Sequence, residues 1–252
     1  VRRWGVRPYE ARDREAVRRI CGGTGFLGEP IDPVFEDRDV FAEILTAYYT
    51  DREPESCFVV ERDGEVRGSL MGSRHRARQK RFGVAHGRRV AALALWRCIT
   101  RPYGKASRRY MWWVVTRSWR EVPDAPKCVP HFHINLLKDV RGVGETRELI
   151  DRFLEYLREC GEREVYGQMV VFDDRRGERM FARYGFRVLN RGEVTKFRRF
   201  REGKVFLFTV VKDIGANTRL YGKDLLREAG RSEEHRSALQ SRITISYAVF
   251  CL

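Results

Sequence analysis

The stretch His131-Phe132-His133-Ile134-Asn135-Leu136-Leu137, followed by the turn Arg141-Gly142-Val143-Gly144, decides the fold that this sequence predicts. The run from Phe132 to Leu137 is mostly apolar and short, which indicates a buried β-strand. The segment Arg147–Cys160 then has apolar residues at helical spacing, at Leu149, Ile150, Phe153, Leu154 and Leu157. A strand, a turn and a helix in this order are typical of an α/β protein.

The glycine-bearing turn is also a candidate anion site. The first turn of a helix has unpaired N–H groups and carries partial positive charge. Gly142 and Gly144 would let a phosphate approach the backbone closely, and Arg141 adds a cation. A pyrophosphate fits such a turn. An ordinary strand-to-helix turn without a ligand is the alternative interpretation.

The rest of the chain predicts a mixed α/β arrangement. Before the central stretch we expect strands at Gly5–Tyr9, Ser56–Glu61 and Val66–Met71, with a hairpin turn at Asp63-Gly64. We expect helices at Asp13–Cys21, which Gly22-Gly23 ends, and at Val40–Tyr49. After it we expect a strand at Glu164–Phe172, a helix at Asp174–Tyr184, and closing strands at Phe186–Leu189, Val194–Phe197 and Val205–Val211. Residues 213–252 are expected to form a C-terminal appendage of unknown role.

The composition favours a water-soluble protein. The chain has 252 residues, 42% hydrophobic and 34% charged, and no apolar run approaches the ~20 residues that cross a bilayer. The six cysteines are scattered without metal-site spacing, so we expect reduced thiols and no metal. The N-terminus lacks the apolar core of a signal peptide, which indicates a cytoplasmic location.

Most of the net charge of +15 lies in one segment. Residues 73–130, called the basic segment below, contain 15 Lys and Arg and only two acids. The cations alternate with Trp96, Trp112, Trp113 and Trp119. This pattern suits nucleic acid, an anionic membrane surface or an acidic acceptor. Packed helices whose arginine face is merely solvated are the fourth alternative.

These elements and the residues at their joints resemble the GNAT acetyltransferase superfamily. The acetyl-CoA motif of that family reads [Gln/Arg]-x-x-Gly-x-[Gly/Ala], and here it is Arg141-Gly142-Val143-Gly144-Glu145-Thr146. The strand 131–137 is similar to the family's fourth strand, and Asp174 to Phe186 to a later helix. The resemblance covers 1–72 and 131–212, with the basic segment as a helical insertion between the third and fourth strands. The strand further resembles a bacterial subgroup related to the acetyltransferase-like domain of O-GlcNAc hydrolases.

The resemblance implies a GNAT domain at 1–212 and an acetyl-CoA-dependent N-acetyltransferase. The fourth strand would splay from the fifth, and the pantetheine would pair with Leu136 and Leu137. The pyrophosphate would lie on the turn, and an amine would attack the thioester directly. The implied cofactor-binding residues are Leu136, Leu137, Arg141, Gly142, Val143, Gly144, Glu145, Thr146, Asp174 and Phe181.

The sequence departs from the family's pattern at four of these positions. Thr146 stands where Gly or Ala is usual, and Glu145 brings a carboxylate close to the pyrophosphate. Asp174 replaces the usual Asn, and Phe181 occupies the place of a frequent Tyr acid. Either the thiolate leaves without that acid, or nearby Tyr184 substitutes for it, or activity is weak or lost.

His133 is the first candidate for the general base, because the fourth strand faces the acceptor and imidazole titrates near neutrality. A satisfied, buried strand histidine is the alternative interpretation. His131 shares its strand face, and a water relay to a distant carboxylate stays open.

Two functions remain at this stage. One is acetyl transfer to a small-molecule or peptide amine, in a protein that could form a homodimer. The other is a catalytically weak or inactive GNAT scaffold that binds nucleic acid or an anionic membrane through the basic segment.

Overall fold

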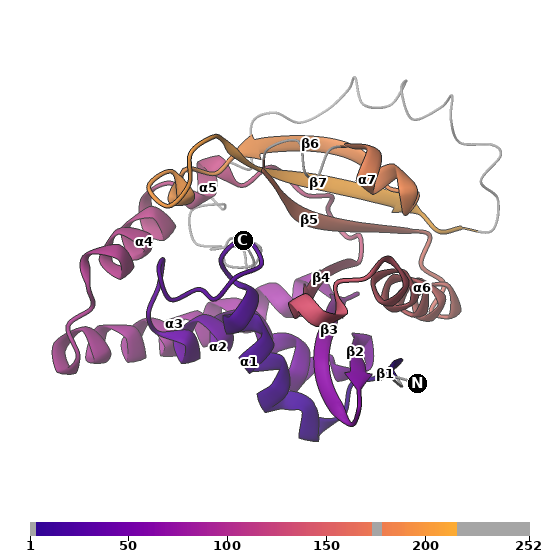
Figure 1. Cartoon of the computed structure of the whole chain (residues 1–252), viewed down its shortest axis with the longest axis horizontal. Coiled ribbons are helices and arrows are strands. Elements are labelled where there is room, and N and C mark those ends of the chain that lie inside the picture. Colours follow the sequence, from indigo (N-terminus) through magenta and orange to yellow (C-terminus); the bar gives the residue numbers. More distant parts are fainter. Residues whose placement is uncertain (1–3, 173–177, 216–252) are drawn as a thin grey trace.

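The computed structural model describes residues 4–172 and 178–215. Its centre is one seven-stranded mixed sheet with the order β1-β2-β3-β4-β5-β7-β6 (Figure 1). The strands are β1 Trp4–Pro8, β2 Cys57–Arg62, β3 Glu65–Ser73, β4 His131–Leu136, β5 Glu164–Phe172, β6 Arg187–Glu193 and β7 Val205–Asp213. The predicted mixed α/β class is confirmed. Asp174 and nearly all of the predicted appendage lie outside the described residues.

The N-terminal half of the sheet is an antiparallel set of β1 to β4. Asp63 and Gly64 turn the β2–β3 hairpin with φ angles of 52° and 82°, as a tight hairpin turn requires. Helices α1 Arg14–Thr24 and α2 Arg38–Arg52 pack on one face. The predicted stop at Gly22-Gly23 is wrong: the helix continues to Thr24, and an added Cβ at Gly22 would touch the Arg38 side chain.

The two halves of the sheet meet at β4 and β5, which are parallel. Only two ladder pairs join these strands, His131 with Tyr166 and Phe132 with Gly167. Beyond Phe132 the two strands separate, and we call the gap between them the β4–β5 opening. Strand β4 stays paired with β3 along its whole length. The expected splay of the fourth strand from the fifth is thus confirmed.

The C-terminal half comprises β5, β7 and β6 with α6 Val143–Glu159 and α7 Glu178–Arg183. Helix α6 begins four residues before the predicted Arg147, so Gly144 lies inside its first turn. The predicted strand at Val194–Phe197 is wrong. Residues Thr195–Phe197 form a 3-10 turn, and Phe197 is buried in the core instead of extending a strand.

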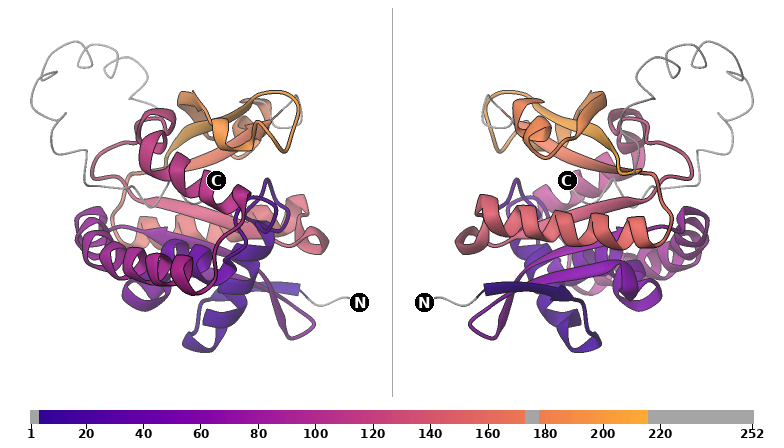
Figure 2. Two further views of the ribbon diagram at one scale, coloured as in Figure 1. Left: turned by 90° about the vertical axis from the view of Figure 1, so that its left-hand side faces the viewer. Right: turned by 90° about the vertical axis from the view of Figure 1, so that its right-hand side faces the viewer.

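The basic segment is helical, with α3 Arg76–Thr100, α4 Lys105–Thr116 and α5 Ser118–Glu121. The left panel of Figure 2 shows α3 crossing the near end of the molecule and α4 rising from it towards the β5–β7 half. Asp37, the N-cap residue of α2, anchors α3 and the α3–α4 connection, because it accepts hydrogen bonds from Arg97 and from Tyr103 Oη (2.6 Å). Glu121 holds the upper part, accepting from Trp113 Nε1 (2.6 Å) and Thr195 N (2.7 Å). The segment therefore bridges the two halves of the sheet.

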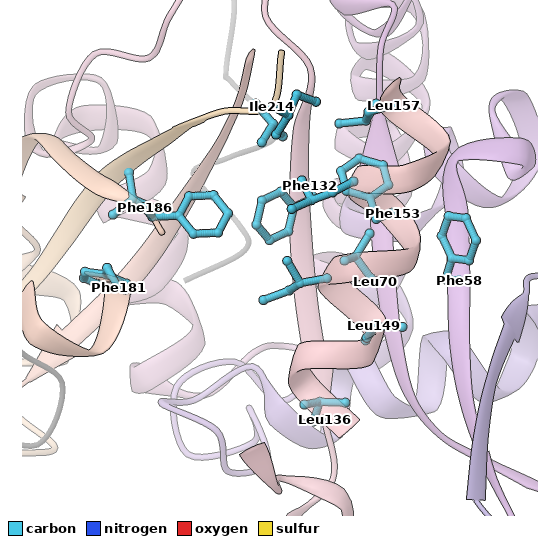
Figure 3. Packing of buried hydrophobic residues seen from close by; sticks show 14 of the residues in the cluster. Phe58, Leu70, Phe132, Leu136, Leu149, Phe153, Leu157, Phe181, Phe186 and Ile214 are labelled. Atoms are coloured by element: carbon cyan, nitrogen blue, oxygen red, sulfur yellow. The ribbon is translucent and has the colours of Figure 1, made fainter. Parts of the chain in front are cut away.

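Three hydrophobic clusters make up the core. One packs α6 and α7 onto the sheet, and Figure 3 shows Phe132 of β4 between Phe153 of α6 and Phe186 of the β5–β7 half. A second lies between α1, α2 and the first strands. The third joins α2, the basic segment and the residues around Phe197. These clusters fix the elements that border the β4–β5 opening.

Candidate functional site

The first turn of α6 lies directly after the β4–β5 opening. Gly142 is the N-cap residue with extended backbone angles, and Gly144 is exposed in the first turn. An added Cβ at Gly144 would meet no atom closer than Trp4 Cζ2, at 3.8 Å. Within the described part of the chain, the amides of Gly144 and Glu145 have no recorded hydrogen-bond acceptor. Free amides at a helix N-terminus can bind an anion.

The side chain of Glu145 folds back over this turn. Its carboxylate lies so close to Gly142 that an added Cβ there would overlap it. A glutamate at the third helical position can cap its own helix in this way. An incoming phosphate would have to displace this carboxylate. Thr146, whose amide bonds the Gly142 carbonyl at 3.2 Å, continues the helix normally.

The guanidinium of Arg141 bonds backbone carbonyls rather than pointing freely at the turn. Its Nε donates to the Leu136 carbonyl (2.8 Å), and its Nη2 donates to the Gly28 carbonyl. Arg141 thus ties the end of β4 to the connection between α1 and α2. Its predicted contact with a pyrophosphate would have to use the remaining nitrogen, Nη1, or replace one of these bonds.

The backbone of β4 offers hydrogen-bonding groups at the opening. Leu137 N–H donates to the Arg67 carbonyl of β3 (3.0 Å), and the Leu137 carbonyl accepts from Val140 N (3.1 Å). Because backbone groups alternate along a strand, those of Ile134 and Leu136 point towards β5. The Leu136 N–H therefore fits the predicted pairing with pantetheine, whereas the Leu136 carbonyl accepts from Arg141 Nε and both groups of Leu137 are engaged within the chain.

His131 and His133 lie side by side beneath this opening, with ring centroids 5.4 Å apart. His131 Nε2 is 2.9 Å from Tyr49 Oη and 3.2 Å from Gln79 Nε2. His133 packs edge-on against the Tyr49 ring, and no hydrogen-bond partner of its Nε2 is found within the described ranges. His133 is buried but not satisfied, so it remains a candidate proton acceptor.

Burial keeps both imidazoles neutral. It lowers the pKa of His133 to about 4 and that of His131 well below 6.5, to which the neighbouring His133 and the Arg76 cation also contribute. A neutral imidazole can accept a proton at pH 7, but a pKa of about 4 makes His133 a weak base until a ligand changes its surroundings.

Phe181 and Tyr184 lie at the end of α7. Phe181 is buried and packs on Phe208 at 6.0 Å between ring centroids, so it is a core residue. Tyr184 is half-buried, and the Arg147 guanidinium of α6 lies 5.7 Å from its ring centroid. Tyr184 is thus the phenol close to the first two turns of α6. The predicted residue Asp174 lies outside the described residues, as does the side chain of Val143.

Sequence reasoning missed the partners of the histidines. Tyr49 on α2 and Gln79 on α3 bond His131, and Arg76 Nη1 donates to Tyr166 Oη (2.9 Å). The only indication in the sequence is the pair Tyr48-Tyr49, two hydroxyl-bearing side chains in a predicted helix whose other apolar residues are typical of a core. The first turn of α3, in the basic segment, therefore contacts His131 and Tyr166 at the end of the opening where β4 and β5 are still paired.

Neither a metal-ligand cluster nor a membrane-spanning helix occurs among the described residues. In residues 4–172 and 178–215, no group of three or more His, Cys, Asp or Glu side chains is arranged to hold a metal. No helix in the same ranges is both long and apolar enough to span a membrane.

Comparison with known proteins identifies the fold. No family model matches the sequence, and no curated protein matches it. Among solved structures, a protein named SsHAT is 25% identical with a TM-score of 0.52, over 84% of this chain and 98% of that one. Also similar is yncA of Salmonella typhimurium, provisionally assigned as an acetyltransferase and solved with its cofactor acetyl-CoA. It is 14% identical with a TM-score of 0.50, over 86% of this chain and 96% of that one. The chain has the GNAT acetyltransferase fold.

Proposed function

We propose that this chain is an acetyl-CoA-dependent N-acetyltransferase that transfers acetyl to an amine acceptor. The observation that carries the proposal is the separation of β4 from β5 after two pairs, directly before a helix whose first-turn amides are available. A structural neighbour with this fold was solved with acetyl-CoA, which supports the same ligand here. The finer resemblance to the subgroup related to O-GlcNAc hydrolases rests on the β4 sequence alone.

The residues at the opening fit the two ends of acetyl-CoA. The first turn of α6 would hold the pyrophosphate through the amides of residues 143–145, since Gly144 leaves open space above it. The backbone of Ile134 and Leu136 would pair with the pantetheine amides, as an added strand does. Acetyl-CoA supplies an activated thioester carbonyl for attack by the amine.

His133 is the proposed proton acceptor. It is neutral at pH 7, and no partner of its Nε2 is found in the described part of the chain. Nε2 of His131 is already bonded to Tyr49 and Gln79, and Nδ1 of His131 is buried, so we assign His131 to orienting the cluster and His133 to accepting the proton. The neutral amine would attack the thioester, and the proton that its nitrogen then sheds would pass to this imidazole or to a water that the imidazole holds.

Tyr184 is the proposed acid for the leaving thiolate. A proton donor there would assist departure of the thiolate, because the sulfur leaves with a negative charge. Phe181 has no proton to give and is enclosed by the core. Tyr184 is half-buried beside Arg147, a cation that also favours an anionic leaving group.

Calorimetry with acetyl-CoA tests the proposal. Wild type is expected to bind, and Gly144→Trp is expected to abolish binding, since an indole would fill the space above the first turn of α6. Gly87→Trp is the matched control, because Gly87 is an exposed helical glycine with no atom within 4 Å of an added Cβ. Unchanged affinity in Gly144→Trp would contradict the placement of the cofactor.

The second candidate, a scaffold with little or no turnover, is favoured by the Glu145 carboxylate over Gly142 and by the engagement of Arg141. A release assay for free CoA with a panel of amines separates the two. Release with any amine supports the enzyme, and binding of acetyl-CoA without release supports the scaffold.

A further inference from the structure

The basic segment combines exposed apolar side chains with exposed cations. Large apolar side chains project from α3, α4 and α5 with exposed fractions from 57% at Trp119 to 76% at Ile99; they are Leu95, Trp96, Ile99, Trp112, Val115 and Trp119. Leu95, Trp96 and Ile99 lie near the end of α3, and Trp112, Val115 and Trp119 lie on α4 and α5; we call the two sets together the Trp/aliphatic face. Single exposed hydrophobic residues are ordinary, but a concentration of them marks an interaction surface.

Cations surround this face. Arg88, Arg89, Arg108 and Arg109 are exposed on α3 and α4, and no carboxylate among the described residues lies within ion-pair distance of them. Beside α4 a cavity of about 270 Å³ is also cationic, with Arg109, Arg117, Arg198 and Arg199 in its lining next to Trp112 and Phe200. No acidic residue lines this cavity. The charge of the surface therefore calls for an anionic partner.

The helices that carry this face are held firmly by the rest of the fold. Arg97 and Tyr103 donate to Asp37 before α2, and Glu121 accepts from Thr195 N in the C-terminal half. Both α3 and α4 lie at the same end of the molecule (Figures 1 and 2). The apolar side chains are thus presented on packed helices, so little ordering is needed when a partner binds.

The positive charge of this surface argues against two partners, a second copy of the chain and the chain's own residues 216–252. A second copy would bring a +13 segment against another, which like-charge repulsion opposes. The chain's own residues 216–252 contain six Lys and Arg and four Asp and Glu, so they supply no net negative charge.

Aliphatic side chains distinguish the remaining anionic partners. Bases of single-stranded nucleic acid stack on aromatic rings, which would use Trp96 and Trp112 but leave Leu95, Ile99 and Val115 in water. A bilayer interface accepts all six side chains, with aliphatics among the acyl chains, tryptophans at the boundary and arginines on the phosphates.

We propose that the Trp/aliphatic face and its arginines bind the surface of an anionic phospholipid bilayer. The protein lies on the membrane without crossing it. This inference does not depend on acetyl transfer.

Vesicle co-sedimentation of the full chain tests it. Binding is expected to vesicles of phosphatidylcholine with phosphatidylglycerol, not to phosphatidylcholine alone, and to fall when salt rises from about 0.1 M to about 1 M. The variant Trp96→Ser/Ile99→Ser/Val115→Ser, and separately Arg88→Glu/Arg89→Glu, should each weaken binding at least about tenfold. Their melting temperatures and acetyl-CoA affinities should match wild type, since these side chains are exposed.

Leu189→Ser on β6 is the matched apolar control, and Arg12→Glu before α1 is the charge control. Both should bind anionic vesicles like wild type. Three results would overturn the proposal. They are no binding to anionic vesicles, binding to a single-stranded oligonucleotide but not to vesicles, and a dimer in sedimentation velocity that dissociates in the serine variant.

Discussion

The Glu145 carboxylate lies over Gly142, where an anion would approach the first turn of α6. It interacts favourably with the helix dipole but repels a pyrophosphate. Glu145→Gln is therefore expected to tighten acetyl-CoA binding roughly three- to tenfold and to lower the free energy of unfolding by about 0.5 kcal/mol. Calorimetry and urea unfolding measure the two effects. Glu148→Gln, in the second turn of α6, is the control; weaker binding in Glu145→Gln would show that this carboxylate assists the cofactor.

Tyr184 gives a second prediction at the residue scale. Tyr184→Phe removes the phenol beside Arg147 and keeps the ring that packs there. We expect kcat to fall about 10- to 100-fold with little change in acetyl-CoA affinity, as for the loss of a general acid. Steady-state kinetics with calorimetry separates these quantities. An unchanged kcat would mean that the thiolate leaves without this acid.

Phe181→Tyr provides the complementary variant. Phe181 is buried against Phe208, so an added hydroxyl would enter the core and cost about 1–3 kcal/mol of stability. It should not restore the rate of Tyr184→Phe. If the double variant regains activity, the acid belongs at position 181.

Among the elements, the anchoring of α3 and α4 depends on Asp37. Its carboxylate accepts from Arg97, Tyr103 and Val40 N, and thereby also caps α2. Asp37→Ala should lower the free energy of unfolding by roughly 2–4 kcal/mol, because it removes a cap and leaves the Arg97 cation without this partner. Amide exchange should rise in α3 and α4 and stay slow in β4. Asp39→Ala is the control, since Asp39 is an exposed neighbour.

Regular elements with clear periodicity could be predicted from the sequence. The β4–α6 unit and the β2–β3 hairpin follow directly from apolar spacing and from Asp63-Gly64. The errors have physical causes. Helix α1 continues through Gly22, which lies against Arg38 of α2, and through Gly23, which lies near Leu137 after β4. The apolar run at 194–197 is a buried turn in the third cluster, where tertiary contacts override β propensity.

The candidate site was predictable only where it consists of backbone. Gly142 and Gly144 lie at the start of α6 as the sequence predicts, because such a turn needs no distant partner; their role in anion binding stays a prediction. The bonding of His131 to Tyr49 joins residues 82 positions apart, which no local pattern encodes. Likewise, the engagement of Arg141 with Gly28 depends on the path of the α1–α2 connection.

At the scale of the whole molecule, the basic segment supplies contacts between the two halves of the sheet, which the short β4–β5 ladder joins only at one end. Two pairs alone join β4 to β5 in the sheet, so the halves could otherwise change their angle. Arg76 bonds Tyr166 of β5, Asp37 holds α3, and Glu121 holds Thr195 of the upper half. A segment placed on the membrane would therefore also set the width of the β4–β5 opening.

Acid is expected to destabilise the whole fold through the buried histidines. Burial lowers the pKa of His133 to about 4, below its ordinary value of 6.5, so the unfolded chain binds a proton more readily than the folded one. Stability should thus be complete above pH 6.5 and fall as the pH drops towards 4; His133 alone would account for about 2 kcal/mol between pH 7 and pH 5. The pKa of Asp37 is lowered by Tyr103 and Arg97 against the effect of burial, so its contribution is lost only at lower pH. Urea unfolding at pH 7 and pH 5 measures the difference. His133→Phe should reduce it by that amount and exposed His75→Asn should not, whereas equal pH dependence in wild type and His133→Phe would place the acid sensitivity elsewhere.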